Sequence, residues 1–184
     1  METITLAGGC FWCTEAAFRR LKGVFSVTPG YANGHVPHPT YEQVCSGRTG
    51  HAEAVQIEFD PTVITLADIL SVFWLIHDPT SLNRQGNDVG PQYRSAIFCH
   101  TPEQLTGAQQ SRAALEQTGV YRQPIVTVIE PLTSFYPAED YHREYFDSHP
   151  EAPYCRLVID PKLRKLLAQY DTLIDTHWQP ELLR

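Results

Sequence analysis

Hydrophobic positions along this chain recur with two repeat lengths, one typical of strands and the other of helices. In residues 52–59 hydrophobic and more polar side chains alternate, as in a strand with one buried face. Residues 65–77 begin with Thr65 and carry Asp68 three positions later, a pattern that resembles a helix capping box. The same criteria predict further strands at 3–7, 24–28, 93–99, 125–129 and 155–159, and further helices at 10–22, 101–119, 138–146 and 160–174.

Two long polar stretches, residues 29–50 and 78–91, separate these elements. Loops of this length are uncommon in a compact domain unless they shape a site. Interleaved strands and helices favour a sheet covered by helices. We therefore expect a single catalytic domain over residues 1–184, of the α+β class. Its form would be a two-layer sandwich with a mixed sheet, a ferredoxin-like core and long active-site loops.

Composition narrows the classes of function. Hydrophobic residues make up 42% of the chain and charged residues 19%, as in a folded globular protein. Lys and Arg total 14 against 21 Asp and Glu, and the formal net charge of −7 argues against nucleic-acid or membrane partners. The first residues lack the basic and apolar regions of a signal peptide, and no stretch approaches the ~18 apolar residues of a membrane span. We expect a cytoplasmic monomer.

Five cysteines are present, an odd count that does not suggest a disulfide scaffold. Cys10 falls at the start of the predicted first helix, directly after Gly8 and Gly9. Unpaired backbone N–H groups and the helix dipole stabilise a thiolate at such a position. Glycines before it let another molecule approach closely. These features predict a reactive thiolate at Cys10.

Cys10 and Cys13 have the C-x-x-C spacing, which places two sulfurs within disulfide reach on one helical turn. Half of a zinc site and two inert buried thiols are the alternatives. A zinc site needs about four ligands, and the sequence has no second C-x-x-C, so we expect no metal. Between the thiols stand Phe11 and Trp12, which could wall an apolar pocket for a small apolar group beside the reacting atom.

The segment Gly9-Cys10-Phe11-Trp12 resembles the active-site motif of the A-type peptide methionine sulfoxide reductases. Four further segments are similar to this family and occur in its order, so the resemblance spans residues 8–160. They are the glycine-rich residues 30–34, the long stretch 41–53, the paired stretches 77–80 and 85–95, and residues 138–142.

The resemblance implies that Cys10 attacks the sulfur of methionine sulfoxide while Phe11 and Trp12 hold the methyl group of the substrate. It implies selectivity for the S epimer, in proteins, peptides or the free amino acid. A sulfenic acid on Cys10 would then condense with a second thiol to a disulfide. Thioredoxin, or dithiothreitol in vitro, would reduce this disulfide by exchange, with no bound cofactor.

The resemblance also implies that Tyr41, Glu53 and Tyr93 surround the sulfoxide oxygen, with Asp88 supporting the site. This oxygen is a poor leaving group until it is protonated. A carboxylic acid can donate near pH 7 only if burial raises its pKa from about 4.3. Glu53 directly follows a polar loop at the start of a predicted strand, where such burial is plausible. Tyrosine hydroxyls can donate hydrogen bonds to the oxygen as charge develops.

The resolving thiol stays open at this point. Many members of the family have glycine where this chain has Cys13, and they use a cysteine nearer the C-terminus. Here both Cys13 and Cys155 are present. Cys13 is favoured because closing so short a loop costs little, but Cys155 or a relay through both fits as well. We expect Cys45 to be structural and Cys99 to be buried.

Two other functions compete with sulfoxide reduction. A general thiol-disulfide oxidoreductase or thiol peroxidase also needs an activated cysteine, but it has no use for an acid and two tyrosines around an oxygen. A module that binds methionine-bearing peptides could use the thiols as redox sensors. The histidines 35, 38, 51, 77 and 142 are expected in loops or caps, with His51 as a candidate to support the site.

Overall fold

The computed structural model describes residues 1–179 and contains a six-stranded sheet with the strand order β7-β6-β1-β3-β2-β8. β6 and β7 run parallel and all other neighbours are antiparallel. The sheet is therefore mixed, and the α+β class is confirmed. Its strands are β1 (Glu2–Gly8), β2 (Val24–Ala32), β3 (Ala52–Phe59), β6 (Ser95–Cys99), β7 (Val128–Pro131) and β8 (Phe135–Pro137).

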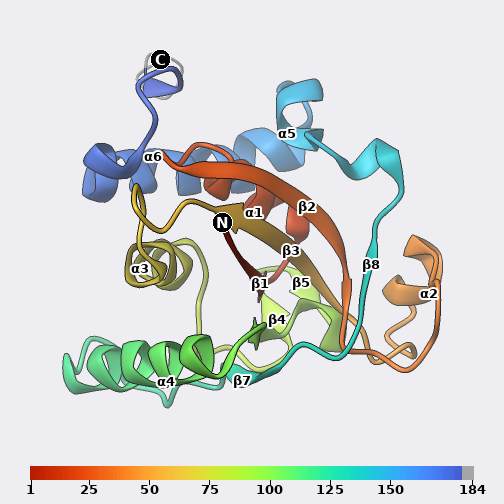
Figure 1. Ribbon diagram of the computed structural model, residues 1–184. Helices are drawn as coiled ribbons and strands as arrows, with labels where there is room; N and C mark the ends of the chain where they lie inside the picture. Colours follow the sequence, from red (N-terminus) through yellow and green to blue (C-terminus); the bar gives the residue numbers. More distant parts are fainter. Residues whose placement is uncertain (180–184) are drawn as a thin grey trace.

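Helices cover one face of this sheet. In the antiparallel pairing of β1 with β3, Ile4 lies opposite Ile57 and Leu6 opposite Val55, and all four are fully buried in the main core. The helices α1, α3 and α6 pack against one another over this core, and α4 covers the β6 and β7 edge (Figure 1). Their bounds are α1 (Phe11–Phe18), α3 (Leu66–Ile76), α4 (Pro102–Gln117) and α6 (Asp160–Tyr170).

The opposite face of the sheet carries small side chains. Alternation along the strands places Ala7, Ala54 and Ala96 there beside Phe98, and partly buried Leu132 and Phe135 pack on this second cluster. No helix contributes to it among residues 1–179. The two-layer arrangement expected from the sequence is therefore present.

Side-chain caps fix where two of the helices begin. Thr65 accepts a hydrogen bond from the backbone N–H of Asp68, whose carboxylate accepts from the backbone N–H of Thr65, so the expected capping box is confirmed. A second capping box joins Thr40 and Gln43 and starts α2 (Tyr41–Cys45). This short helix lies inside residues 29–50, which were expected to be a loop throughout. β2 also extends to Ala32 within that stretch.

The strand expected at residues 155–159 is wrong. Cys155–Ile159 forms a π-helical turn that continues directly into α6. Buried side chains recur at Cys155, Ile159, Leu163 and Leu166, a spacing of three to four residues that places one apolar stripe against the core. Pro161 lies where the π-helical turn passes into α6, so its missing N–H falls at the point where the helical hydrogen-bond pattern changes.

Other bounds also differ from the expectation. Residues 138–146 do not form one helix, because Glu144 adopts a left-handed φ of 54° between a 3₁₀ turn (Asp140–His142) and α5 (Tyr145–Ser148). The first helix ends at Phe18, and the strand expected at 125–129 begins only at Val128. The polar stretch 78–91 holds a small hairpin of β4 (Arg84–Gln85) and β5 (Asp88–Val89). Within residues 1–179, no helix is both long and apolar enough to cross a membrane.

Candidate active site

A tight turn between β1 and α1 presents Cys10. Cys10 is the N-cap residue of α1, and Gly9 before it has a φ of 95°, which favours glycine. A Cβ atom on Gly9 would lie 2.7 Å from Cγ of Gln85, so no larger residue fits. Cys10 lines a cavity of about 630 Å³ and is 9% exposed, against 3% for Cys13 and 0% for Cys155. Cys10 is therefore the most accessible of the three thiols.

The thiol of Cys10 is not the resting thiolate that the sequence predicted. The backbone N–H of Trp12 does donate a hydrogen bond to its sulfur, as expected at a helix start. Burial nevertheless raises the pKa of Cys10 well above its ordinary value, and a hydrogen bond to Cys13 raises it further. Loss of hydration thus outweighs the helix amide, because the charged form is the one that burial destabilises.

Cys13 carries the lower pKa of the two thiols. The hydrogen bond that it accepts from Cys10 lowers the pKa of Cys13 to about 7, against the opposing effect of burial, and the charge of Lys162 contributes. Of the two thiols, Cys13 is therefore the one whose anion is favoured. Cys13 can therefore receive the proton of Cys10 when Cys10 attacks.

Glu53 provides a buried acid beside these thiols. It lies on β3, is 1% exposed, and its Oε1 accepts a hydrogen bond of 3.2 Å from the backbone N–H of Phe11. Burial raises the pKa of Glu53 to about 8, and the negative charges of Asp88 and Cys13 add to the shift. Its Oε2 is buried with no hydrogen-bond partner among residues 1–179. The carboxyl group is therefore protonated at neutral pH and has one oxygen available to a ligand.

Two tyrosines lie near this acid. Burial raises the pKa of both Tyr41 and Tyr93 above the ordinary value, and the charge of Glu53 is the next contribution for each. Both hydroxyl groups stay protonated and can donate. In this structure the hydroxyl of Tyr41 hydrogen-bonds to the exposed thiol of Cys45, which was expected to be structural. Cys99 is buried, as expected.

Aromatic rings form a wall next to Cys10. Phe11 is fully buried, with its ring centroid 6.4 Å from that of Tyr41 in a stacked arrangement. Trp12 is half-buried and stacks on Tyr145 at 3.8 Å between ring centroids, with an angle of 8° between the planes. The indole Nε1–H of Trp12 donates to Nδ1 of His142 over 3.0 Å. The aromatic pair in the C-x-x-C segment thus faces further rings, as a pocket for an apolar group requires.

Three histidines expected in loops or caps are buried. His142 is fully buried, and because its Nδ1 accepts from Trp12, its Nε2 carries the proton. His77 donates from Nδ1 to the carbonyl of Phe73 at 2.5 Å, and its Nε2 accepts from the hydroxyl of Ser95 at 2.7 Å. His51 joins the long loop to β3: its Nδ1 accepts from the N–H of Gly34 at 2.9 Å, and its Nε2 donates to a carbonyl at 2.7 Å.

Tyr154 is a site residue that the sequence did not single out. Its hydroxyl donates to Oδ2 of Asp88 at 2.8 Å and lies 3.6 Å from Sγ of Cys13. A helical pattern could have revealed it, because Tyr154, Val158 and Lys162 are spaced by four residues and all line the Cys10 cavity. The misassigned strand at 155–159 concealed this spacing.

Cys155 follows Tyr154 but points into the core, where it is fully buried. Burial raises its pKa, and the charge of Cys13 is the next contribution. The charge of Cys13 thus raises the pKa of both Cys10 and Cys155. All five cysteines are free thiols in this structure.

Comparison with known proteins identifies the family of this chain. The family model "Peptide methionine sulfoxide reductase" matches residues 2–173. The chain belongs to the peptide methionine sulfoxide reductase family. It is 60% identical over 173 residues to a peptide methionine sulfoxide reductase MsrA of Thermus thermophilus, covering 94% of this chain and 97% of that protein.

Solved structures of this family have the same fold. The reduced form of Mxr1 from Saccharomyces cerevisiae superposes with a TM-score of 0.78 at 40% identity, covering 84% of this chain and 88% of Mxr1. Mxr1 in complex with Trx2 matches with a TM-score of 0.56 at 31% identity, covering 78% of this chain and 84% of the other.

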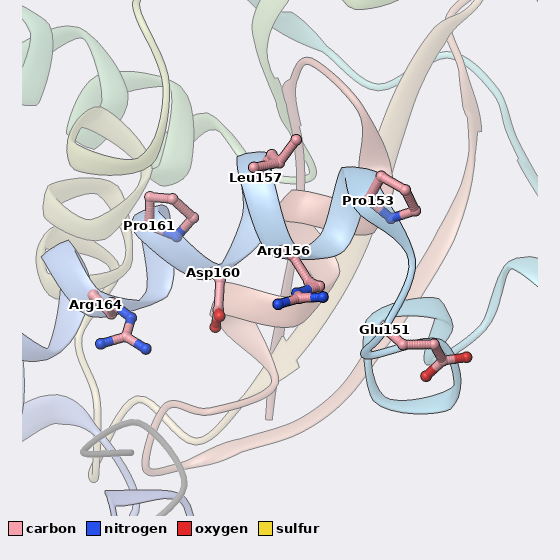
Figure 2. Close-up of a pocket in the computed structure, with 7 residues that line it drawn as sticks. All are labelled: Glu151, Pro153, Arg156, Leu157, Asp160, Pro161 and Arg164. Carbon is pink, nitrogen blue, oxygen red and sulfur yellow. The ribbon is translucent and has the colours of Figure 1, made fainter.

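A second hollow in this reductase, of about 450 Å³, lies along the C-terminal helical segment (Figure 2). Arg156, Asp160 and Arg164 line it, and none of its lining residues belongs to the Cys10 cavity. It contains no thiol. Within residues 1–179, no group of three or more His, Cys, Asp or Glu side chains is arranged to hold a metal ion.

Proposed function

We propose that this reductase converts methionine-S-sulfoxide to methionine, in proteins, in peptides and as the free amino acid, with Cys10 as nucleophile. One observation supports this most directly. A buried carboxyl group with a pKa of about 8, that of Glu53, lies beside the accessible thiol and keeps one oxygen without a protein partner. A protonated acid next to a thiol is what the cleavage of a sulfoxide S–O bond requires.

In the first half-reaction, the sulfur of Cys10 attacks the sulfoxide sulfur. The proton of the Cys10 thiol passes to the adjacent Cys13. Glu53 gives its proton to the sulfoxide oxygen, assisted by the hydroxyls of Tyr41 and Tyr93. The hydroxyl group is transferred to Cys10. The products are methionine and a sulfenic acid on Cys10, so the sulfoxide sulfur is reduced while the cysteine sulfur is oxidised by two electrons.

The methyl group of the substrate lies against Phe11 and Trp12. The positions of both rings are fixed by packing: Phe11 is completely buried, and Trp12 stacks on Tyr145. An apolar wall next to an acid distinguishes the two ends of a methyl sulfoxide and so orients its sulfur toward Cys10.

In the second half-reaction, Cys13 attacks the sulfenic acid, releases water and forms the Cys10–Cys13 disulfide. The lowering of the pKa of Cys13 by the adjacent Cys10 thiol, together with the complete burial of Cys155, supports Cys13 as first resolver. A relay from Cys13 to Cys155 by exchange stays part of the proposal, and the charge of Cys13 contributes to the raised pKa of Cys155. Thioredoxin returns the enzyme to the dithiol by exchange, as the complex of Mxr1 with Trx2 suggests. No bound cofactor takes part.

Several expectations remain predictions: one catalytic domain over residues 1–184, a monomeric state, a cytoplasmic location, and no nucleic-acid or membrane partner. The thiol peroxidase alternative gives no role to a protonated Glu53, and a peptide-binding module gives none to the lowered pKa of Cys13. No observation favours either of them over sulfoxide reduction.

The function is tested with dabsyl-methionine sulfoxide of each epimer and dithiothreitol. The wild type should reduce the S epimer, Cys10→Ser should produce no methionine, and the control Cys99→Ser, which removes a buried thiol elsewhere, should keep at least a large part of the activity. Reduction of the sulfoxide by Cys10→Ser would show that Cys10 is not the nucleophile. Peroxide turnover without sulfoxide turnover by the wild type would favour a thiol peroxidase.

A further inference from the structure

Tyr154 connects a resolving thiol to a carboxylate. Its single hydroxyl proton is donated to Oδ2 of Asp88 at 2.8 Å, while its oxygen lies 3.6 Å from Sγ of Cys13. When Cys13 carries a proton, the S–H group can donate to the tyrosine oxygen, because that oxygen still has free lone pairs. The three groups then form one directed chain from sulfur to hydroxyl to carboxylate.

The chain ends where the leaving group of the second half-reaction would be released. Asp88, Tyr154 and Cys10 all line the same cavity of about 630 Å³. Asp88 is also close enough to Glu53 for its negative charge to raise the pKa of Glu53. A proton that reaches Asp88 thus enters the cavity onto which Cys10 opens.

We propose that Tyr154 relays the proton of Cys13 to Asp88 when Cys13 resolves the sulfenic acid on Cys10. This inference rests on the proposed function and extends it to the second half-reaction. It gives Asp88, which was expected to support the site in general, a specific role as proton acceptor. It makes Tyr154 a catalytic residue, because its hydroxyl touches the reacting sulfur of Cys13.

The step balances. Cys13 arrives protonated, having received the proton of Cys10 in the first half-reaction. Its sulfur forms the S–S bond while the S–O bond of the sulfenic acid breaks. The proton of Cys13 moves to Tyr154 as the proton of Tyr154 moves to Asp88, and the departing hydroxide takes a proton from Asp88. The products are the disulfide, one water, and the tyrosine and aspartate in their starting states.

Burial and nearby charges keep the hydroxyl of Tyr154 protonated between turnovers. Burial raises the pKa of Tyr154 far above its ordinary value, and the charges of Cys10 and Cys13 raise it further, so the hydroxyl does not lose its proton permanently. Lys162, four residues after Val158 on the same helix face, stabilises the negative form of Cys13 through its charge. The relay therefore passes protons without storing a charge on the tyrosine.

The test separates the two half-reactions in the absence of reductant. Rapid quenching measures the burst of methionine, and dimedone trapping with peptide mapping measures how fast the sulfenic acid becomes the Cys10–Cys13 disulfide. For Tyr154→Phe, the ratio of the disulfide rate to the methionine rate should fall about 100-fold, which is the lower end of the usual range for the loss of a proton-transfer group. Asp88→Asn, which keeps the volume but not the acceptor charge, should lower the same ratio.

Three comparisons make the outcome decisive. Tyr170→Phe, which removes a hydroxyl from α6 outside the site, should keep the wild-type ratio. The double variant Tyr154→Phe/Asp88→Asn should lose no more than the worse single variant, because the two groups act in series. In the Cys13→Ser background, Tyr154→Phe should change neither the methionine burst nor the lifetime of the sulfenic acid, because the thiol that the relay serves is absent.

A wild-type ratio in Tyr154→Phe would overturn the relay. So would a fall in the methionine rate alone, which would place the hydroxyl on the substrate instead. Failure of the proposed function would look different, since no variant and not even the wild type would then produce a methionine burst.

Discussion

The indole Nε1–H of Trp12 donates a hydrogen bond to Nδ1 of His142, 130 positions later in the chain, over 3.0 Å. This bond fixes the tautomer of His142 and holds the indole ring in its place beside Cys10. Burial lowers the pKa of His142, so the ring remains neutral and able to accept. The wall of the candidate methyl pocket thus depends on a contact that joins the first helix to the segment before α5.

His142→Leu should weaken this wall. The donor of Trp12 would lose its acceptor, which costs about 1–3 kcal/mol when the group is buried, and the half-buried indole would sample other positions. We expect kcat/KM for a methionine sulfoxide peptide to fall about 5- to 50-fold, mainly through KM. Steady-state kinetics with the exposed-site variant His177→Leu as control measures this effect, and an unaltered KM would show that the bond does not hold the pocket.

Glu53→Gln should raise the stability of the fold and lower the activity. A carboxyl group with a pKa of about 8 in the fold and about 4.5 outside it binds a proton more tightly when folded. Its contribution to stability is fully present below about pH 4.5 and is lost progressively as the pH rises toward about 8, so that about 3 kcal/mol is already lost at pH 7 relative to a neutral group. Glutamine can keep the bond from the N–H of Phe11 without that cost.

We therefore expect Glu53→Gln to unfold at higher urea concentration than the wild type at pH 8, while its methionine burst slows at least 100-fold. The wild-type burst rate should decline as the pH rises through about 8, because the acid form of Glu53 is consumed. Urea unfolding and single-turnover kinetics measure both effects. A variant with the wild-type burst rate would exclude Glu53 as the acid.

Single-turnover experiments on the two candidate resolving thiols should give different disulfides. Cys155→Ser should still form a Cys10–Cys13 disulfide at nearly the wild-type rate. Cys13→Ser should form one methionine per enzyme and then persist as a sulfenic acid, because Cys155 is fully buried and interacts with Cys13. Mass-spectrometric mapping after one turnover decides, and full thioredoxin-dependent turnover by Cys13→Ser would make Cys155 the first resolver.

His77 should make the fold sensitive to acid. Burial lowers the pKa of His77 to about 4, against 6.5 outside the fold, so between these values only the unfolded chain binds the proton. The contribution of neutral His77 is complete above pH 6.5 and is lost progressively as the pH falls toward 4, by up to about 3 kcal/mol. The loss of stability on lowering the pH from 7.5 to 4.5 should be smaller in His77→Gln than in the wild type.

Urea unfolding at both pH values measures this difference. The exposed-site variant His38→Gln is the matched control and should show the acid sensitivity of the wild type. Equal sensitivity in His77→Gln and the wild type would mean that other groups dominate the acid response.

Local pattern was sufficient for the elements that carry their own signals. The capping box at Thr65 and the alternation along residues 52–59 predicted α3 and β3, and the glycine turn before Cys10 predicted a thiol at a helix start. Burial of Glu53 was also expected from its place at the start of that strand. Such features depend on residues that are close together in the sequence, so they can be predicted before the fold is known.

Two elements were missed from the sequence, one because its local signal pointed to a strand and one because its capping box lay inside a polar stretch. Cys155–Ile159 has the β-branched content of a strand, and only its continuation into the buried stripe of α6 makes it helical. The Thr40 capping box of α2 was hidden in a polar stretch. Tertiary packing overrides weak local preference when a whole apolar face gains burial.

The sequence by itself determined most of the side chains that surround the site, through motifs that resemble those of one family, but it did not single out Tyr154. Only the tertiary structure decided how protons are distributed among them: Cys10 keeps its proton, Cys13 yields one more readily, Glu53 stays neutral, and Tyr154 bridges Cys13 to Asp88. Proton affinity depends on the summed loss of hydration and on charges brought together from distant segments. Those quantities exist only once the chain has folded.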